Sequence, residues 1–320
     1  MTGDKTIKTL RQSGTLLGFV LVILFFSVQL PDTFLTARNL INISQQLSML
    51  AVVAATMTIV MVMNDFDLSV GSMASLAGIV AAMMFAAGYP IWMGLSAALF
   101  VGIAGGLFNG FLVSVLGILP FVATLGTLTV YSGAAFYLSG GKTIFGRDIP
   151  QGFSGFARGG FDVGDSKVPF LTITAGIVIF ACWFLLEHTT FGRRLYAIGG
   201  NPEAAHLAGI RIVRLRLIAF ALTGLGAAGA GLMYAARVAS ANPTQGSGLM
   251  LDAIAAVFLG MTVSRQGEPR VLYTLMGVLI LGVLDNGLTQ MSVDSYVREM
   301  LVGLIVIAAV AIASWSKRAR

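Results

Sequence analysis

The chain has few of the residues on which soluble enzymes and metalloproteins depend. It contains one cysteine, Cys182, which excludes a disulfide framework and a cysteine-rich zinc site. Its two histidines, His188 and His206, form no HExxH motif, and no arrangement typical of a Ser-His-Asp triad accompanies them. Only 11% of the residues are charged, whereas soluble domains carry about 25%. These deficits exclude a cytosolic globular enzyme.

A nucleotide-binding loop is also missing. Gly141-Lys142-Thr143 has the end of a phosphate-binding loop, but Phe136 stands where the first glycine of that motif is required. The motif must also follow a strand, whereas an apolar run that predicts a helix precedes it here. We therefore expect no ATP, no metal and no other cofactor in the chain itself, and energy for any work must come from elsewhere.

What the chain has in abundance is apolar residues, which make up 57% of it. A helix that crosses about 30 Å of hydrocarbon needs roughly 20 such residues, and about ten stretches qualify. They cover approximately residues 14–31, 45–63, 70–88, 90–116, 120–138, 169–187, 215–237, 250–263, 271–291 and 297–315. The sequence predicts an all-α integral membrane protein with about ten transmembrane helices in a single transmembrane domain, residues 1–320. The 250–263 stretch is short enough to be broken or only partly inserted.

The basic residues indicate an orientation. If ten spans alternate from a cytoplasmic N-terminus, 13 of the 20 lysines and arginines face the cytoplasm. The other seven are Arg38, Lys142, Arg147, Arg158, Lys167, Arg237 and Arg298. This positive-inside bias accounts for the net charge of +6 without a nucleic-acid partner. We expect a multi-pass protein of the bacterial inner membrane, with both termini cytoplasmic, a cytoplasmic tail at 1–13, a periplasmic loop at 139–168 and a cytoplasmic segment at 188–214.

Two local patterns concern helix packing and docking. Gly102, Gly106 and Gly110 form a row with small-xxx-small spacing, which lets a neighbouring helix approach closely. In the cytoplasmic segment, Asn201 can cap a helix and Gly209 can end it. A helix of about two turns is not stable alone in water. It must dock on its own membrane domain or on a cytosolic partner.

Four segments in order along the chain resemble the permeases of the ribose, xylose and arabinose class of bacterial ABC sugar importers. They are Asn39-Leu40-Ile41-Asn42-Ile43, Asp65-Phe66-Asp67-Leu68-Ser69-Val70-Gly71-Ser72, the run from Phe191 to Ile210, and Leu251-Asp252-Ala253-Ile254-Ala255-Ala256-Val257. The resemblance implies the fold of a type II ABC-importer permease and covers essentially the whole chain. The Asp65-Phe66-Asp67 triplet looks most like the arabinose type.

The resemblance also implies partners. These are a second permease copy in a homodimer, or a related permease, together with a cytoplasmic ABC ATPase that binds ATP and Mg²⁺, and a periplasmic sugar-binding protein. The residues implied to enter a groove of the ATPase are Asn201, Pro202, Glu203, Ala204, Ala205, His206, Leu207, Ala208 and Gly209. One departure from the family pattern is the charged run from Ser264 to Arg270, where a glycine-rich turn is usual. It puts the docking geometry or the identity of the partner in doubt.

Polar residues inside the spans are candidates for a substrate pathway. An ionised side chain near the bilayer centre costs about 2.5 to 3.5 kcal/mol, so aspartates such as Asp252 and Asp285 need a protein or aqueous setting. Sugars bind through hydroxyls, which suits amides and carboxylates. The candidate lining is Gln45, Gln46, Asn64, Asp65, Asp67, Asn109, Asn242, Gln245, Asn286 and Gln290. Alternatively, Asp65 and Asp67 only end one span and cap the next, and Asn109 only bonds across helices.

Together these features predict the permease subunit of an ABC transporter that imports a monosaccharide, a pentose or a related polyol, energised by partner ATPase subunits. The alternative is an ion-coupled secondary sugar transporter, in which buried aspartates would carry protons or sodium. A membrane-embedded enzyme has little support, because the chain offers no convincing set of acid, base and metal ligands.

Overall fold

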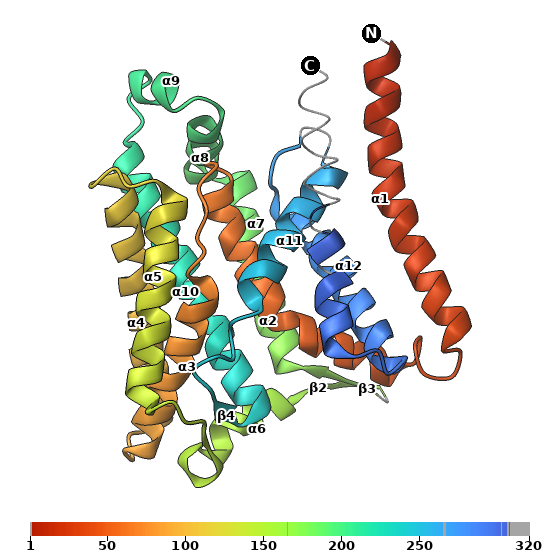
Figure 1. Ribbon diagram of the computed structural model, residues 1–320, viewed down its shortest axis with the longest axis vertical. Coiled ribbons are helices and arrows are strands. Elements are labelled where there is room, and N and C mark those ends of the chain that lie inside the picture. Colours follow the sequence, from red (N-terminus) through yellow and green to blue (C-terminus); the bar gives the residue numbers. More distant parts are fainter. Residues whose placement is uncertain (1, 165, 265–266, 302, 306, 308–320) are drawn as a thin grey trace.

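The computed structural model describes residues 2–164, 166–264, 267–301, 303–305 and 307, and these are mostly α-helical (Figure 1). Among these described residues, six helices are long and apolar enough to cross a membrane. They are α2 (Ala37–Met61), α4 (Ile91–Ser114), α5 (Pro120–Ser139), α7 (Phe170–His188), α10 (Ile212–Val238) and α12 (Val271–Gln290). Three shorter apolar helices lie in α1 (Thr2–Gln29), α3 (Val70–Ala86) and α11 (Leu249–Val263). The chain is therefore a multi-pass helical membrane protein.

The predicted count of about ten spans is not confirmed. The six long helices and the three shorter ones coincide with nine of the ten predicted stretches. The remaining stretch, 297–315, lies largely outside the described residues, although 295–301 is helical. At its start, α2 is longer than predicted, because Thr36 caps it by accepting a hydrogen bond from the Asn39 amide at 3.2 Å.

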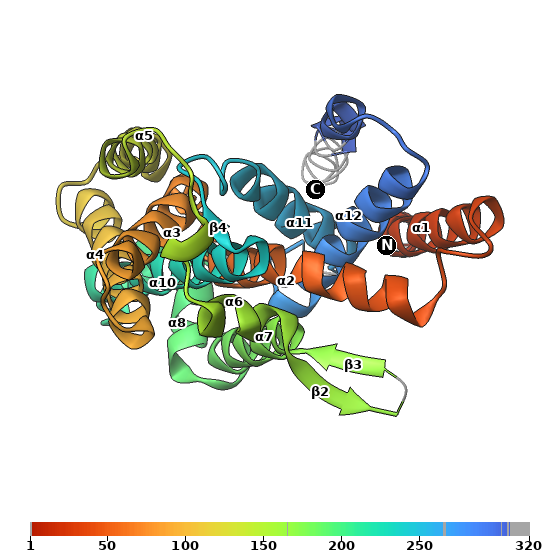
Figure 2. The same ribbon diagram turned by 90° about the horizontal axis from the view of Figure 1, so that it is seen from below.

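The two ends of the molecule differ in structure (Figure 1). One end, which we call the α9 end, carries α8 (Thr190–Gly200), α9 (Pro202–Leu207) and the beginning of α1. The other, the hairpin end, carries α6 (Gln151–Arg158) and the antiparallel hairpin of β2 (Gly160–Val163) and β3 (Ser166–Pro169). Figure 2 shows this hairpin projecting past α7. The ends are thus built from different connections.

A second small sheet joins two distant connections at the hairpin end. β1 (Ile144–Phe145), which precedes a 3-10 turn at Gly146–Asp148, pairs antiparallel with β4 (Ser240–Ala241), with Ile144 opposite Ala241. Because β4 directly follows α10, this pairing fixes the segment 240–248 that leads into α11. The predicted loop 139–168 is therefore ordered by contacts far away in the sequence.

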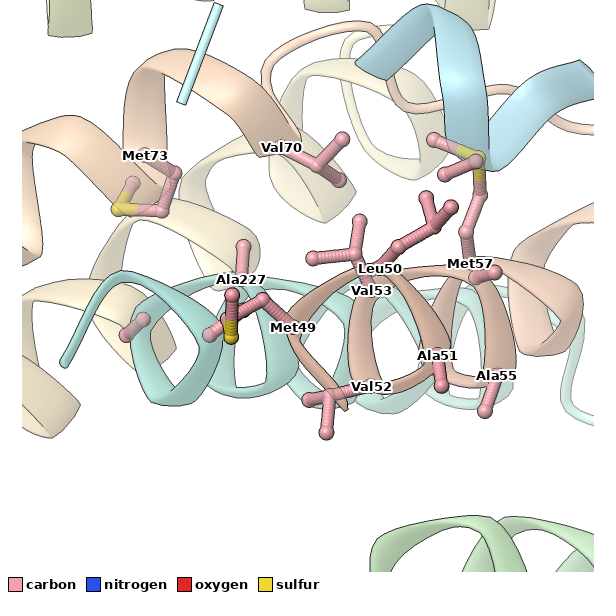
Figure 3. Close-up of a cluster of buried hydrophobic side chains, with 14 of the residues drawn as sticks. Met49, Leu50, Ala51, Val52, Val53, Ala55, Met57, Val70, Met73 and Ala227 are labelled. Atoms are coloured by element: carbon pink, nitrogen blue, oxygen red, sulfur yellow. The ribbon is translucent and has the colours of Figure 1, made fainter. Parts of the chain in front are cut away.

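The core is built around α2, which is buried on every side from Leu47 to its end. Helices α7, α10, α11 and α12 all pack against it. Figure 3 shows Met49, Val53 and Met57 of α2 in one buried cluster with Met73 of α3 and Ala227 of α10. A helix that is apolar all round is expected at such a position. By contrast, α1, α4, α5 and α7 expose large apolar side chains, as expected of helices that face lipid.

The predicted packing role of the glycine row is confirmed. A Cβ on Gly106 would collide with the carbonyl oxygen of Phe220, and one on Gly102 would lie 2.6 Å from the carbonyl oxygen of Gly224. In return, a Cβ on Gly224 would collide with the carbonyl oxygen of Gly102. Helices α4 and α10 therefore meet backbone to backbone, as small residues allow in membrane proteins.

Candidate functional site

The connection between α2 and α3 lies at the α9 end and contacts α8 directly. Asn64 adopts φ 61°, a left-handed conformation that asparagine tolerates better than most residues. Its side-chain Nδ2 donates a hydrogen bond of 2.7 Å to the carbonyl oxygen of Gly199 in α8. Gly199 has no room for a side chain, because a Cβ there would collide with the carbonyl oxygen of Val62. The backbone of α8 therefore rests on this connection.

Asp65 ties the same connection to the beginning of α10. Arg216 donates from Nε to Oδ2 of Asp65 at 2.8 Å and from Nη2 to Oδ1 at 3.2 Å, the two-point geometry that suits a guanidinium and a carboxylate. Asp65 is only 3% exposed. Burial raises the pKa of Asp65 to about 6, while the charge and the hydrogen bond of Arg216 act in the opposite direction. The pair is a buried clamp between two elements.

Asp67 lies just before α3 and joins the connection to α4. Its Oδ1 accepts hydrogen bonds from the Ser69 amide at 2.9 Å and the Ser69 hydroxyl at 2.6 Å. Asn109 donates from Nδ2 to the Ser69 hydroxyl at 2.8 Å, and Asp67 and Asn109 are both buried. Asn109 thus bonds across helices, as in the alternative, whereas Asp67 holds the residue before α3 and does not cap the helix itself, because its N-cap is Ser69. These contacts supply no argument for a substrate pathway through these residues.

Asn286 is likewise occupied by the fold. Its amide and that of Asn39 exchange two hydrogen bonds, at 3.0 and 3.1 Å, which join α12 to the beginning of α2. Gln290 donates to Oδ1 of Asn286 at 2.8 Å. The amide of Gln45 is half-buried on α2, next to Gln46. Of this group, only Gln46 contacts a cavity described below.

Asn242 and Gln245 shape the segment between α10 and α11. Asn242 donates from Nδ2 to the Thr143 hydroxyl at 2.8 Å and accepts from the Thr244 amide at 2.8 Å. Gln245 accepts from the Asn242 amide at 3.1 Å and donates to the carbonyl oxygen of Gly231 at 3.3 Å. Because each amide bonds both within the turn and to a residue outside it, Thr143 or Gly231, the two side chains hold the backbone of this segment in place.

A cavity of about 140 Å³ lies where this segment meets α3 and α5, and we call it the hydroxyl cavity. Its lining consists of Leu68, Gly71, Ser72, Ser75, Leu128, Ser132, Pro243, Thr244, Ser247 and Met250. The sequence analysis missed these serines and threonines, because hydroxyl side chains also occur wherever membrane helices pack. Only the tertiary arrangement, which brings three distant segments together, reveals them as one surface.

A second cavity, of about 220 Å³, lies between α2, α10, α11 and α12, and we call it the charged cavity. Its polar lining residues are Gln46, Tyr234, Arg237, Asp252 and Asp285. Gln46 donates from Nε2 to Oδ2 of Asp285 at 2.6 Å, and Arg298 donates from Nη1 to Oδ1 at 2.6 Å. Both aspartates thus have the protein or aqueous setting that their cost in lipid requires.

Helix α9 has the predicted caps and two unlike faces. Oδ1 of Asn201 accepts the Ala204 amide at 3.0 Å, and Gly209 ends the turn with φ 79°. Ala205 is only 4% exposed, because α9 rests on α10 at this point. Ala205 therefore lies outside the surface that a partner could reach, contrary to its predicted place in the docking residues. The remaining face is open, and Leu207 on it is 86% exposed.

The charged turn before α12 makes contacts within the chain. Residues 265–266 lie outside the described residues, but Arg270 donates from Nη1 to Oε2 of Glu187 at 3.0 Å. Tyr196 of α8 donates to Oε1 of Glu187 at 3.1 Å and to the carbonyl oxygen of Pro269 at 3.2 Å. Burial raises the pKa of Tyr196, so this phenol stays protonated. The unusual turn therefore anchors α8 to the ends of α7 and α12.

A mostly helical membrane domain with polar cavities between its helices, and a short exposed helix at one end, is the arrangement of a membrane permease. The chain belongs to the family of branched-chain amino acid transport system permease components, whose family model matches residues 39–310. Members are transport components, not enzymes.

Individual relatives match along nearly the whole chain. The chain is 38% identical over 304 residues to the ribose import permease protein RbsC of Escherichia coli (strain K12), covering 94% of this chain and 93% of that protein. It is 37% identical to the same permease of Bacillus subtilis (strain 168), covering 94% and 92%. It is 34% identical to the L-arabinose transport system permease protein AraH of Escherichia coli (strain K12), covering 97% and 92%.

The fold has a solved counterpart in an inward-facing conformation of a metal-chelate type ABC transporter, with a TM-score of 0.53 at 14% identity, covering 94% of this chain and 98% of that one. This likeness shows the fold of an ABC transporter permease. The resemblance to the ribose, xylose and arabinose class is confirmed by the relatives. Their identities do not single out the arabinose type that the triplet at 65–67 indicated.

Proposed function

We propose that the chain is the permease subunit of an ABC transporter that imports a monosaccharide, a pentose or a related polyol, across the inner membrane. The observation that carries this proposal is 38% identity along 94% of the chain to a ribose import permease. The family description names branched-chain amino acids. The individual relatives at 33% to 38% identity, over more than nine-tenths of the chain, are named for sugars, and they support the sugar class.

The exposed face of α9 supports docking to a cytoplasmic ABC ATPase. The helix has six residues, too few to be stable alone, and Ala205 fixes it to the membrane domain. The apolar side chain of Leu207 is exposed to water, and a groove on a partner would bury it. ATP and Mg²⁺ belong to that partner. The docking surface comprises Asn201, Pro202, Glu203, Ala204, His206, Leu207, Ala208 and Gly209.

The same arrangement supports the orientation. The beginning of α1, with Lys5, Lys8 and Arg11 in its sequence, lies at the α9 end (Figure 1). The positive-inside bias assigns this end to the cytoplasm. The hairpin end then faces the periplasm, where β2, β3 and α6 form the surface available to a sugar-binding protein. The nine helices described above, completed by the stretch at 297–315, would give ten spans and a cytoplasmic C-terminus.

The small volumes of the two cavities, and the exposed polar side chains of one of them, support pairing with a second permease copy or a related permease. The two cavities, of about 140 and 220 Å³, are both smaller than the roughly 300 to 1,000 Å³ of ligand pockets. Thr244 and Ser247 of the hydroxyl cavity are exposed, and the cavity is also lined by residues of α5 and α11, which Figure 2 shows on the side opposite α7 and the hairpin. Polar groups at membrane depth require protein or water as neighbours. A second chain on this side would enclose a pathway.

Reconstitution in vesicles tests the proposal. The purified chain alone should neither bind nor hydrolyse ATP, and it should not concentrate sugar. With a cognate ATPase, a sugar-binding protein and ATP inside, the vesicles should accumulate ribose or another pentose. Concentrative uptake by the chain alone, abolished by a proton or sodium ionophore, would overturn the proposal in favour of an ion-coupled secondary transporter.

A further inference from the structure

The charged cavity contains polar groups that the fold does not use. It lies toward the hairpin end, since Tyr234 and Arg237 are near the end of α10 and Asp285 is near the end of α12. Asp285 already accepts hydrogen bonds from Gln46 and Arg298, as described above. These two hydrogen bonds fix the position of the Asp285 carboxylate in the cavity wall.

Three other lining groups lack such partners. Within the described part of the chain, neither the Asp252 carboxylate nor the Arg237 guanidinium forms an ion pair, and the Tyr234 hydroxyl makes no hydrogen bond. Asp252 and Tyr234 are half-buried, whereas Arg237 is exposed and stays in contact with water. Polar groups taken from water without a partner cost free energy, and the cost is greater for charges. Their convergence on one cavity indicates that a ligand supplies what the protein does not.

The chemistry of the lining selects the ligand. Asp252 and Asp285 lie near Arg237 and Arg298, with the exposed Glu299 also close to Asp252, so neither sign of charge is in large excess and the lining does not select a strongly charged ligand. A carboxylate accepts hydrogen bonds from hydroxyl groups, a guanidinium donates to hydroxyl oxygens, and a tyrosine hydroxyl does both. The remaining walls are apolar side chains of Leu47, Met49, Leu50, Leu249 and Leu281, which suit C–H surfaces.

We propose that the charged cavity is a binding subsite for a neutral polyhydroxylated ligand, a monosaccharide, in the half of the permease nearest the hairpin end. This inference rests on the proposed function and assigns particular residues to it. Asp252 and Arg237 would bind hydroxyls, and Tyr234 would close one side. The cavity is open and smaller than closed ligand pockets, which suits a weak site that a transported molecule occupies and leaves.

Saturation-transfer NMR on the permease assembled with its ATPase in nanodiscs, without binding protein, tests the subsite. D-ribose, L-arabinose and D-galactose at millimolar concentrations are the probes. Transfer to at least one sugar is expected, and Asp252→Asn or Arg237→Gln should weaken it by about tenfold or more, because hydrogen bonds to charged groups are the strong ones. Asp148→Asn, an exposed carboxylate at the hairpin end, should leave the signal unchanged.

The outcomes separate this inference from the proposed function. No transfer to any of the three sugars, or transfer that Asp252→Asn and Arg237→Gln leave intact, overturns the subsite even if the complete transporter imports sugar. Transfer that depends on these residues supports the subsite. If the complete transporter with its binding protein imports none of the three sugars, the proposed function falls separately. Unchanged thermal unfolding of each variant shows that the loss is not one of folding.

Discussion

At the scale of single residues, α9 carries two neighbouring side chains with opposite surroundings. Ala205 is packed inside the chain, whereas Leu207, two positions later, is almost fully exposed. Sequence reasoning could identify the helix from Asn201 and Gly209, because caps are local. It could not tell which face rests on α10, because that depends on how the whole segment docks. A larger side chain at Ala205 would therefore disturb internal packing and would not report on a partner.

Leu207→Ser should weaken association with the ATPase by about tenfold to a hundredfold. Burying a leucine side chain contributes about 1.5 to 3 kcal/mol, and each 1.4 kcal/mol is a factor of ten. Affinity of the ATPase for nanodisc-embedded permease, measured by surface plasmon resonance, gives the answer. Leu35→Ser, an exposed leucine at the hairpin end, is the matched control and should have no effect. Equal affinities for both variants and the parent would remove α9 as the contact.

At the scale of elements, the connection between α2 and α3 links α8 and α10 to the core. Asn64 bonds to α8, Asp65 bonds to Arg216 of α10, and Asp67 holds the residue before α3. The apolar runs alone indicated where most helices lie. The small sheets were not predictable, because β1 pairs with β4 almost a hundred residues away. The hydroxyl cavity was not predicted for the same reason, because its lining comes from distant segments. Gln46, by contrast, was a candidate from the sequence, because an amide inside a predicted span is unusual.

The clamp at Asp65 should give the permease a specific dependence of stability on pH. The pKa of Asp65 is raised from 3.8 to about 6 in the folded protein. Between these values the folded state binds more protons than the unfolded state, so the contribution of Asp65 to the free energy of unfolding falls as pH rises. Asp65→Asn should remove this component between about pH 4 and pH 6, as measured by thermal unfolding in detergent.

Two further variants show whether the pH dependence of thermal unfolding comes from the Asp65 carboxyl and its pair with Arg216. Asp148→Asn, an exposed carboxylate, should retain the parental pH profile. The double variant Asp65→Arg with Arg216→Asp should recover part of the thermal stability that each single variant loses, because the two residues act as a pair. A parental slope in Asp65→Asn between pH 4 and pH 6 would mean that this carboxyl titrates equally in both states, contrary to its burial.

At the scale of the whole molecule, the two ends should lie on opposite sides of the membrane. With Cys182 replaced by alanine, Asp162→Cys in the hairpin should react in intact cells with a thiol reagent that does not cross membranes. Glu203→Cys on α9 should react only after the cells are opened. Both positions are exposed in the structure, so access depends on the side alone. Labelling of Glu203→Cys from outside would invert the topology and remove the argument for an ATPase at α9.

The burial of α2 on all sides also bears on the order in which the protein is made. The helix enters the membrane before α7, α10, α11 and α12 have been synthesised, so for a time it is surrounded by lipid. Two of its hydroxyl groups have hydrogen-bond acceptors within the helix itself. Thr56 donates to the carbonyl oxygen of Val52 at 2.9 Å, and Thr58 donates to that of Ala54 at 2.7 Å. The contact of 2.9 Å between the Thr58 and Thr274 hydroxyls is added only when α12 arrives. The most central helix of the finished protein can therefore be accommodated in the bilayer before the helices around it are present.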